Sequence, residues 1–242
     1  MSYELILGDC LDVMRGMADS SVDMCLTSPP YNLGNSQKGS FYQGQSKGDR
    51  ITYNSHSDDM PDENYVTWQH AVILEMYRLL KPGGAIFYNH KPRIVDGVFD
   101  DRKRLIPLPI RQEIVWDRCC MVNFSGSFYA PSTERIYIIA KSGWKPQREF
   151  LGFGEVWRVA PETNTEHPAP FPLKLAKRAI VSGSSEGAII LDPFAGSGTT
   201  GVAALQTNRH FVGIELDSEY VTIAQRRIEQ AAAQPMLLEV TA

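Results

Sequence analysis

The stretch AIILDPFAGSGTTGVAAL, residues 188–205, constrains the fold more than any other part of the chain. An apolar run that ends in Asp192 predicts a buried strand, and Gly196 and Gly198 predict a tight turn into a helix. Glycines let a ligand approach the backbone, and the free N–H groups at the start of the helix face it. Nineteen residues after Gly196, the run HFVGIEL brings Glu215 to the spacing at which an acid meets ribose hydroxyls. The stretch therefore predicts a nucleotide-cofactor site.

A second buried run, VDMCLT, ends in the tetrapeptide SPPY, residues 28–31. The two prolines fix the backbone and remove two N–H donors, so the carbonyl of Pro29 projects beside the hydroxyl of Ser28. Tyr31 adds a π-face on which a planar ring can stack. An ordinary Pro-Pro turn is the structural alternative. The functional interpretation is a site that accepts hydrogen bonds from a planar ring and stacks on it.

Strand patterns alternate with helix patterns along the rest of the chain, which predicts an α/β fold with a largely parallel sheet. In such a fold, ligands bind at the carboxyl ends of the strands. Strands are expected at 3–7, 22–27, 85–89, 112–116, 135–140, 188–191 and 210–216, and helices at 10–17, 65–80, 172–181 and from Thr199 onward.

Composition excludes several other classes of protein. No run approaches eighteen apolar residues, and the start MSYELILGD has neither a basic flank nor an apolar core, so we expect no membrane span or secretory signal. The four cysteines show no C-x-x-C spacing, so we expect no disulfide framework and no metal site. Cys10, Cys25, Cys119 and Cys120 are expected to be small buried side chains.

The net charge of −4 hides an uneven distribution. Residues 1–80 carry 5 Lys+Arg against 11 Asp+Glu, whereas residues 81–182 carry 16 against 10. The basic middle predicts a surface for nucleic acid, although an uneven solvated surface is the plainer interpretation.

Together, SPPY and the downstream FAGSG resemble the S-adenosylmethionine-dependent DNA amino-methyltransferases. The order matches the permuted beta group, in which the catalytic motif precedes the cofactor motif. The resemblance covers most of the chain and includes GDC at 8–10, LKPGG at 80–84, HPAPFPLKLAKRAI at 167–180 and GIEL at 213–216. It implies a class I methyltransferase fold, Rossmann-like and circularly permuted, with helices on both faces of a mainly parallel seven-stranded sheet. We expect one catalytic domain over 1–242, with a catalytic half at about 1–140 and a cofactor half at about 165–230.

The same resemblance implies S-adenosyl-L-methionine as the cofactor and assigns the residues around it. Phe194, Gly196 and Gly198 would line its methionine and ribose. Glu215 would hold the ribose, Asp9 would meet the adenine amino group, and Phe171 would close the pocket. The further positions expected to line this site are Cys10, Asp192, Pro193, Thr199, Thr200 and Leu216, and the expected catalytic group is Ser28, Pro29, Pro30 and Tyr31.

Elementary chemistry agrees with a methyl transfer to an amine. An exocyclic amino group is a poor nucleophile because its lone pair is delocalised into the ring. Ser28 Oγ and the Pro29 carbonyl would accept its N–H bonds and direct the lone pair at the methyl group. No histidine or thiolate chemistry is required, so the five histidines are expected to be structural or solvent-facing: His56, His70, His90, His167 and His210.

The target base stays open between two alternatives. In the family that the chain resembles, Ser at the first position of the tetrapeptide favours cytosine-N4, and adenine-N6 is the alternative. An amino-methyltransferase acting on protein or RNA is a more remote possibility, and a non-catalytic DNA-binding module with the same fold also stays open. A zinc base deaminase is excluded, because it needs an H-x-E and a P-C-x-x-C that this chain lacks.

The expected partner is double-stranded DNA, out of which the target base must flip. Phosphate contacts are expected from Lys91, Arg93, Arg102, Lys103 and Arg104, and base-edge contacts from a mobile polar loop at 32–62 that includes Arg50. A cognate restriction endonuclease and a homodimer are open as further partners. We expect a DNA-associated cytoplasmic protein of a prokaryote or phage.

Overall fold

The computed structural model describes residues 1–32, 60–120, 127–162 and 171–233. Most of the expected loop at 32–62, with Arg50, lies outside the described residues, as do His56 and His167.

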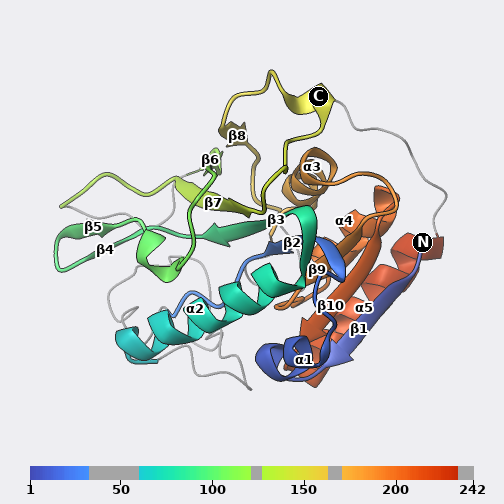
Figure 1. Ribbon diagram of the computed structural model, residues 1–242. Helices are drawn as coiled ribbons and strands as arrows, with labels where there is room; N and C mark the ends of the chain where they lie inside the picture. Colours follow the sequence, from blue (N-terminus) through green and yellow to red (C-terminus); the bar gives the residue numbers. More distant parts are fainter. Residues whose placement is uncertain (33–59, 121–126, 163–170, 234–242) are drawn as a thin grey trace.

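Eight strands form one sheet in the order β1-β10-β9-β2-β3-β7-β6-β8 (Figure 1). The five strands from β1 to β3 are mutually parallel, β7 runs antiparallel to both β3 and β6, and β8 is parallel to β6. This sheet confirms the predicted class I methyltransferase architecture. The strands are β1 (Tyr3–Leu7), β2 (Val22–Thr27), β3 (Leu80–His90), β6 (Gln112–Asp117), β7 (Thr133–Ala140), β8 (Val156–Arg158), β9 (Ile189–Asp192) and β10 (His210–Glu215).

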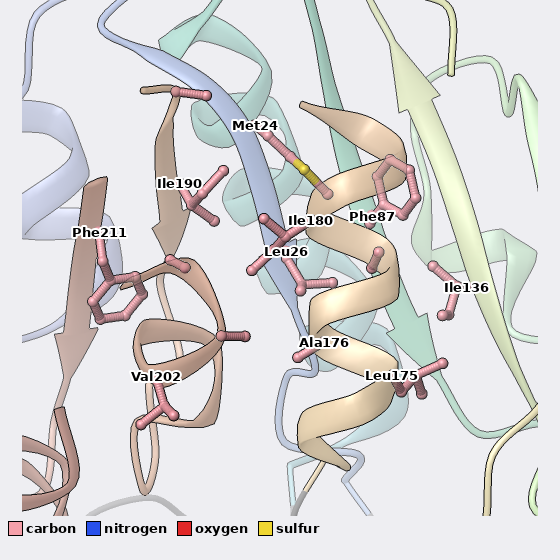
Figure 2. Close-up of a cluster of buried hydrophobic side chains, with 14 of the residues drawn as sticks. Met24, Leu26, Phe87, Ile136, Leu175, Ala176, Ile180, Ile190, Val202 and Phe211 are labelled. Carbon is pink, nitrogen blue, oxygen red and sulfur yellow. The ribbon is translucent and has the colours of Figure 1, made fainter. Parts of the chain in front are cut away.

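Helices cover both faces of this sheet, as predicted. One buried cluster joins the sheet to α1 (Cys10–Gly16) and α2 (Asp62–Leu79). The other joins the opposite face to α3 (Leu173–Gly183), α4 (Thr199–Gln206) and α5 (Ser218–Ala233). Figure 2 shows α3 packed against the sheet, with Ile180 beside Leu26 of β2.

The central strands are apolar throughout because both of their faces are covered. In β2, Met24 and Leu26 belong to the cluster under α3, whereas Cys25 belongs to the cluster under α2. Gly183 allows α3 to approach closely, since a Cβ there would lie 2.9 Å from the ring of Phe87. A near-continuous apolar run is what a doubly covered parallel strand requires.

Two short features differ from the sequence prediction. The sheet has eight strands rather than seven because the three-residue strand β8 extends it beyond β6. A separate hairpin pairs β4 (Arg93–Val95) with β5 (Val98–Asp100) through Asp96 and Gly97, which both have positive φ, at 51° and 78°. Such a two-residue turn suits a hairpin, but strands of three residues leave too little alternation to detect. Two short 3₁₀ helices, at Lys103–Leu105 and Arg148–Phe150, complete the described elements.

The parallel strands bring their carboxyl ends to one edge of the sheet. β9 lies between β10 and β2, so Asp192 at the end of β9 is flanked by Glu215 and Thr27. On the outer side of β10, Leu7 pairs with Glu215, and Gly8 N donates to the Glu215 carbonyl at 2.9 Å. Both sequence motifs therefore meet at this edge. No helix in the described part of the chain is long and apolar enough to cross a membrane.

Candidate active site

Asp192 organises the turn between β9 and α4. Its Oδ1 accepts from Thr27 Oγ1 at 2.8 Å and from Phe194 N at 3.1 Å, and its Oδ2 accepts from Thr200 Oγ1 at 2.6 Å. Burial raises the pKa of this carboxyl to about 6. The negative charge of the nearby Glu215 adds to this rise, whereas the three hydrogen bonds oppose it. Asp192 therefore fixes the turn through its side chain, and Thr200 is a partner of that carboxylate.

The pKa of Asp192 gives a prediction about stability. Below about pH 4 the group is protonated in both the folded and unfolded chains. Between about pH 4 and 6 only the unfolded chain loses its proton, so the free energy of unfolding should fall by about 3 kcal/mol as the pH rises through this window. In Asp192→Asn this part of the pH dependence should disappear, as measured by denaturant unfolding at a series of pH values. Parallel curves for the wild type and the variant would show that another group titrates.

The two glycines of the turn have different roles. Gly196 has φ 49°, and among the described residues a Cβ built there meets only Phe194 O, at 3.9 Å, so these residues leave its backbone open to a ligand. Gly198 has φ 80°, but a Cβ there would lie 2.9 Å from the Cβ of Ala224 in α5. The missing Cβ of Gly198 therefore allows close packing against α5, and the expected contact of Gly198 with the cofactor stays a prediction. Thr199, which begins α4, is buried.

Glu215 closes the turn from the adjacent strand. Its Oε2 accepts from Gly196 N at 2.7 Å and its Oε1 from Asp217 N at 2.9 Å. Burial raises the pKa of this carboxyl above its ordinary value. Asp217, which follows soon after Glu215, is buried, and its Oδ1 accepts from Glu219 N at 2.8 Å in the first turn of α5.

Asp9 and Cys10 lie beside this turn, after the end of β1. Asp9 is the N-cap of α1, with Oδ1 accepting from Leu11 N at 2.9 Å and Asp12 N at 3.2 Å, and its side chain is exposed. Cys10 is buried, and this burial raises the pKa of its thiol to about 12. Cys25 is also buried, whereas Cys119 and Cys120 are exposed, so the expectation of buried side chains is wrong for that pair.

Both phenylalanines expected at the cofactor contact a tryptophan. Phe194 lies edge-on to Trp68 of α2, with ring centroids 5.5 Å apart, and Phe171 lies edge-on to Trp116 of β6 at 5.9 Å. Trp68 was not among the sequence predictions. Pro193 is buried and Leu216 is exposed.

The SPPY residues are part of a polar network at the end of β2. Ser28 Oγ lies 2.8 Å from Tyr31 Oη, which donates to Glu134 Oε2 at 3.0 Å. Asn89 Nδ2 donates to Tyr31 Oη at 2.6 Å, to Glu134 Oε2 at 3.0 Å and to Ser28 Oγ at 3.3 Å. Arg118 forms an ion pair with the other oxygen of Glu134, at 3.2 Å.

Neighbouring aromatic groups hold the loop in place. Tyr31 stacks on His90, with ring centroids 4.6 Å apart, and Tyr65 Oη donates to the Pro30 carbonyl at 2.6 Å. Tyr65 Oη also lies 3.0 Å from His90 Nε2. Burial lowers the pKa of His90 to about 3, so this ring is neutral at physiological pH and packs the loop, in agreement with the structural role expected for it.

Sequence reasoning missed Asn89, Glu134 and Tyr65. A signal existed for Asn89, because it ends an expected strand next to the SPPY strand. The position of Glu134 near Asn89 results from the antiparallel pairing of β3 with β7, in which Asn89 is opposite Ile136 and His90 is opposite Arg135. That pairing cannot be read from the order of elements.

The five basic residues expected at phosphates have different surroundings. Arg102 is fully buried, with Nη1 2.8 Å from Asp100 Oδ2 and its guanidinium 5.5 Å from the ring centroid of Tyr65. Its burial corrects the expectation of a phosphate contact, since its charge is directed into the protein. The other four are at least partly exposed: Arg93 and Arg104 pair with Asp62, Lys103 pairs with Asp101 and Glu113, and for Lys91 no ion pair is seen within the described residues. Burial lowers the pKa of Lys91, and the nearby Glu134 opposes this shift.

A side-chain hydrogen bond connects the strand ends that carry the two motifs. Thr27 Oγ1 donates to Asp192 Oδ1, and Thr27 immediately precedes Ser28. The glycine turn and the SPPY loop thus belong to one hydrogen-bonded unit. Among the described residues there is no group of His, Cys, Asp and Glu side chains that could hold a metal ion.

The strand order, the acidic glycine turn after β9 and the SPPY loop after β2 define a class I methyltransferase that uses S-adenosyl-L-methionine. The profile of a family described as DNA methylase, N6_N4_Mtase, matches residues 22–226. The chain belongs to this family and is a DNA methyltransferase.

Two curated DNA methyltransferases are similar in sequence to nearly the whole chain. DNA adenine methyltransferase YhdJ of Escherichia coli K12 is 27% identical over an alignment 264 residues long, which covers 94% of this chain and 83% of YhdJ. Type II methyltransferase M2.MboI of Moraxella bovis is 28% identical over 257 residues, which cover 95% of this chain and 88% of M2.MboI.

Solved structures show the same architecture. TTHA0409 of Thermus thermophilus, described as a DNA modification methylase, superposes with a TM-score of 0.69 at 26% identity over 96% of this chain and 97% of its own. Its complex with S-adenosyl-L-methionine gives a TM-score of 0.66 at 25% identity over the same shares. The cytosine-N4-specific PvuII DNA methyltransferase shares the fold, with a TM-score of 0.73 at 19% identity over 94% of this chain and 86% of its own.

Proposed function

We propose that this protein is a site-specific DNA methyltransferase that transfers a methyl group to the exocyclic amino group of a flipped base, with cytosine-N4 favoured over adenine-N6. The observation that carries the proposal is the Thr27–Asp192 hydrogen bond, at 2.8 Å, because it fixes the SPPY loop directly beside the glycine turn. An amine held at Ser28 would then lie next to a cofactor held at Gly196. Residues 1–242 would act as one catalytic domain.

The cofactor would be held by groups that this edge of the sheet presents. Gly196 offers an open backbone, Glu215 a carboxylate on the turn and Asp9 an exposed carboxyl group, and Phe194 and Phe171 offer aromatic surface. When bound, S-adenosyl-L-methionine supplies an electrophilic methyl group on a sulfonium. The protein would not need to activate that methyl group, so its own residues would act on the amine.

Ser28, Pro29, Pro30 and Tyr31 would form the amine site. Two acceptors, Ser28 Oγ and the Pro29 carbonyl, would bind the two N–H bonds and leave the nitrogen lone pair directed at the methyl group. The Pro30 carbonyl already accepts from Tyr65, so it serves to fix the loop. Stacking on Tyr31 would hold the plane of the base.

The preference for cytosine rests on Ser28 at the first position of the tetrapeptide. Relatives of both kinds support an amino-methyltransferase, since YhdJ is named for adenine and PvuII methyltransferase for cytosine-N4. Adenine-N6 is therefore the second candidate.

The Type II names among the relatives support a role beside a cognate restriction endonuclease. A homodimer stays a prediction.

Contacts with DNA phosphates would come from Lys91, Arg93, Lys103 and Arg104, and base-edge contacts from Arg50. Three of these side chains have acidic partners. An isolated exposed ion pair is worth only about 0–1 kcal/mol, so a phosphate can readily replace an acid at Lys103, whereas Arg93 and Arg104 share Asp62 and would give up a network of ion pairs. The side chains of Lys103 and Arg104 are 46% and 42% exposed, which leaves both within reach of DNA.

One experiment tests the function and the target base together. The protein is expressed in a bacterial host that lacks DNA methylation, and the host DNA is sequenced by a method that reports N4-methylcytosine and N6-methyladenine in their context. We expect a single sequence context to carry the modification, at cytosine. Modification at adenine would transfer the assignment to the alternative, and unmodified DNA from a folded, cofactor-binding protein would overturn the proposal.

A further inference from the structure

The hydrogen bonds around Ser28 have a direction that the buried carboxylate sets. Glu134 is 6% exposed, and its Oε1 is paired with Arg118, so Oε2 is left for Tyr31 and Asn89. An ionised carboxylate only accepts hydrogen bonds. Tyr31 Oη therefore donates to Glu134, as the 3.0 Å contact shows.

This direction passes along the network to Ser28. Asn89, 1% exposed, must turn its amide N–H groups toward the carboxylate, and its two hydrogens have their shortest contacts with Tyr31 Oη and Glu134 Oε2. Tyr31 Oη has then spent its only hydrogen, so across the 2.8 Å contact Ser28 must be the donor. The Ser28 hydroxyl hydrogen is thus held away from the amine, and its oxygen lone pairs are kept as acceptors.

We propose that Glu134 is a positioning residue that terminates a proton relay running from Ser28 through Tyr31. The inference rests on the proposed function and adds the route by which the amine loses its proton. As the nitrogen forms its bond to the methyl carbon, the bond from that carbon to sulfur breaks, and the sulfonium leaves as a neutral thioether. One N–H proton passes to Ser28 Oγ, the Ser28 proton to Tyr31 Oη, and the Tyr31 proton to Glu134 Oε2. The relay ends with a neutral carboxylic acid and a neutral methylated base, and the acid returns its proton to water between turnovers.

Two single variants and their combination test this relay. In Glu134→Gln an amide takes the place of the terminal acceptor, and in Tyr31→Phe the ring stays but the relay hydroxyl is lost. Each change should lower kcat about 10²-fold, with KM for DNA and for cofactor within about threefold of wild type. Calorimetric affinity for S-adenosyl-L-methionine should stay close to wild type in both variants, whereas the melting temperature should fall in Glu134→Gln, because Arg118 loses its buried ionic partner, and change little in Tyr31→Phe. The double variant should be no more than about threefold slower than the slower single variant, because either change alone already breaks the relay.

Glu113→Gln is the matched control. Glu113 is on the neighbouring strand β6 and pairs with Arg135 at 2.8 Å, so the same chemical change is made outside the relay, and kcat should be unchanged.

Wild-type kcat in either single variant would overturn the relay, and so would losses that multiply in the double variant. Should Glu134→Gln fail to fold, Tyr31→Phe alone decides, since full kcat without the hydroxyl excludes the route. A wild-type protein that methylates no DNA would instead overturn the proposed function.

Discussion

Ser28→Ala should slow methyl transfer about 10²–10³-fold, the usual cost of removing one preorganised hydrogen-bonding group from an active site. Cofactor affinity should stay within about threefold of wild type, because the contacts of Ser28 Oγ are with Tyr31 and Asn89 and not with the glycine turn. Single-turnover transfer of a labelled methyl group gives the rate, and calorimetry gives the affinity.

Ser21→Ala is the control for this change. Ser21 immediately precedes Val22, the first residue of β2, and therefore lies at the end of the strand opposite to Ser28. Its buried hydroxyl has no hydrogen-bond partner among the described residues, so its removal should leave the rate unchanged. Near-normal turnover in Ser28→Ala would place the amine site elsewhere on the molecule.

Gly198→Val should destabilise the protein by about 2–6 kcal/mol, which combines about 1–3 for overpacking with about 1–3 for a positive φ. The reason is the 2.9 Å that a Cβ would leave to Ala224, together with a φ of 80° that a β-branched residue avoids. Since a domain of ordinary stability has about 5–15 kcal/mol in total, much of this protein could unfold at 37 °C. Denaturant unfolding measures the loss.

Gly196→Ala is the informative comparison. Within the described residues its Cβ would come no closer than 3.9 Å to another group, Phe194 O, so we expect a stability loss of only about 1 kcal/mol and a clear loss of cofactor affinity. A Gly198→Val protein with wild-type stability but no cofactor binding would show that Gly198 faces the ligand after all.

Much of the fold could be predicted because parallel strands have a strong local signature. The runs ending in Thr27 and Asp192 are apolar because helices cover both faces of the sheet, and the glycines after Asp192 mark the turn. Since parallel strands share one carboxyl edge, the two motifs could be expected to meet although Ser28 and Asp192 are 164 positions apart in the sequence.

The other features of the site could not be predicted, because they depend on contacts between residues that are far apart in the sequence. Arg102 occurs in a basic run that looks like a surface, and only the packing of Tyr65 and Asp100 around it buries the guanidinium. Glu134 reaches Tyr31 because β7 runs antiparallel to β3, which fixes a register that no local pattern encodes. The role of Gly198 likewise depends on where α5 packs.

The hydrogen bond between Thr27 and Asp192 has a thermodynamic consequence. Asp192 also holds Phe194 N and Thr200, so a ligand that orders the glycine turn also orders the residue before Ser28. The two substrates should then bind with positive cooperativity, and linkage requires that each raise the affinity of the other by the same factor. The flipped base would be held most tightly when the methyl donor is already present, so extrusion of a base from the duplex would be coupled to the readiness of the enzyme to modify it.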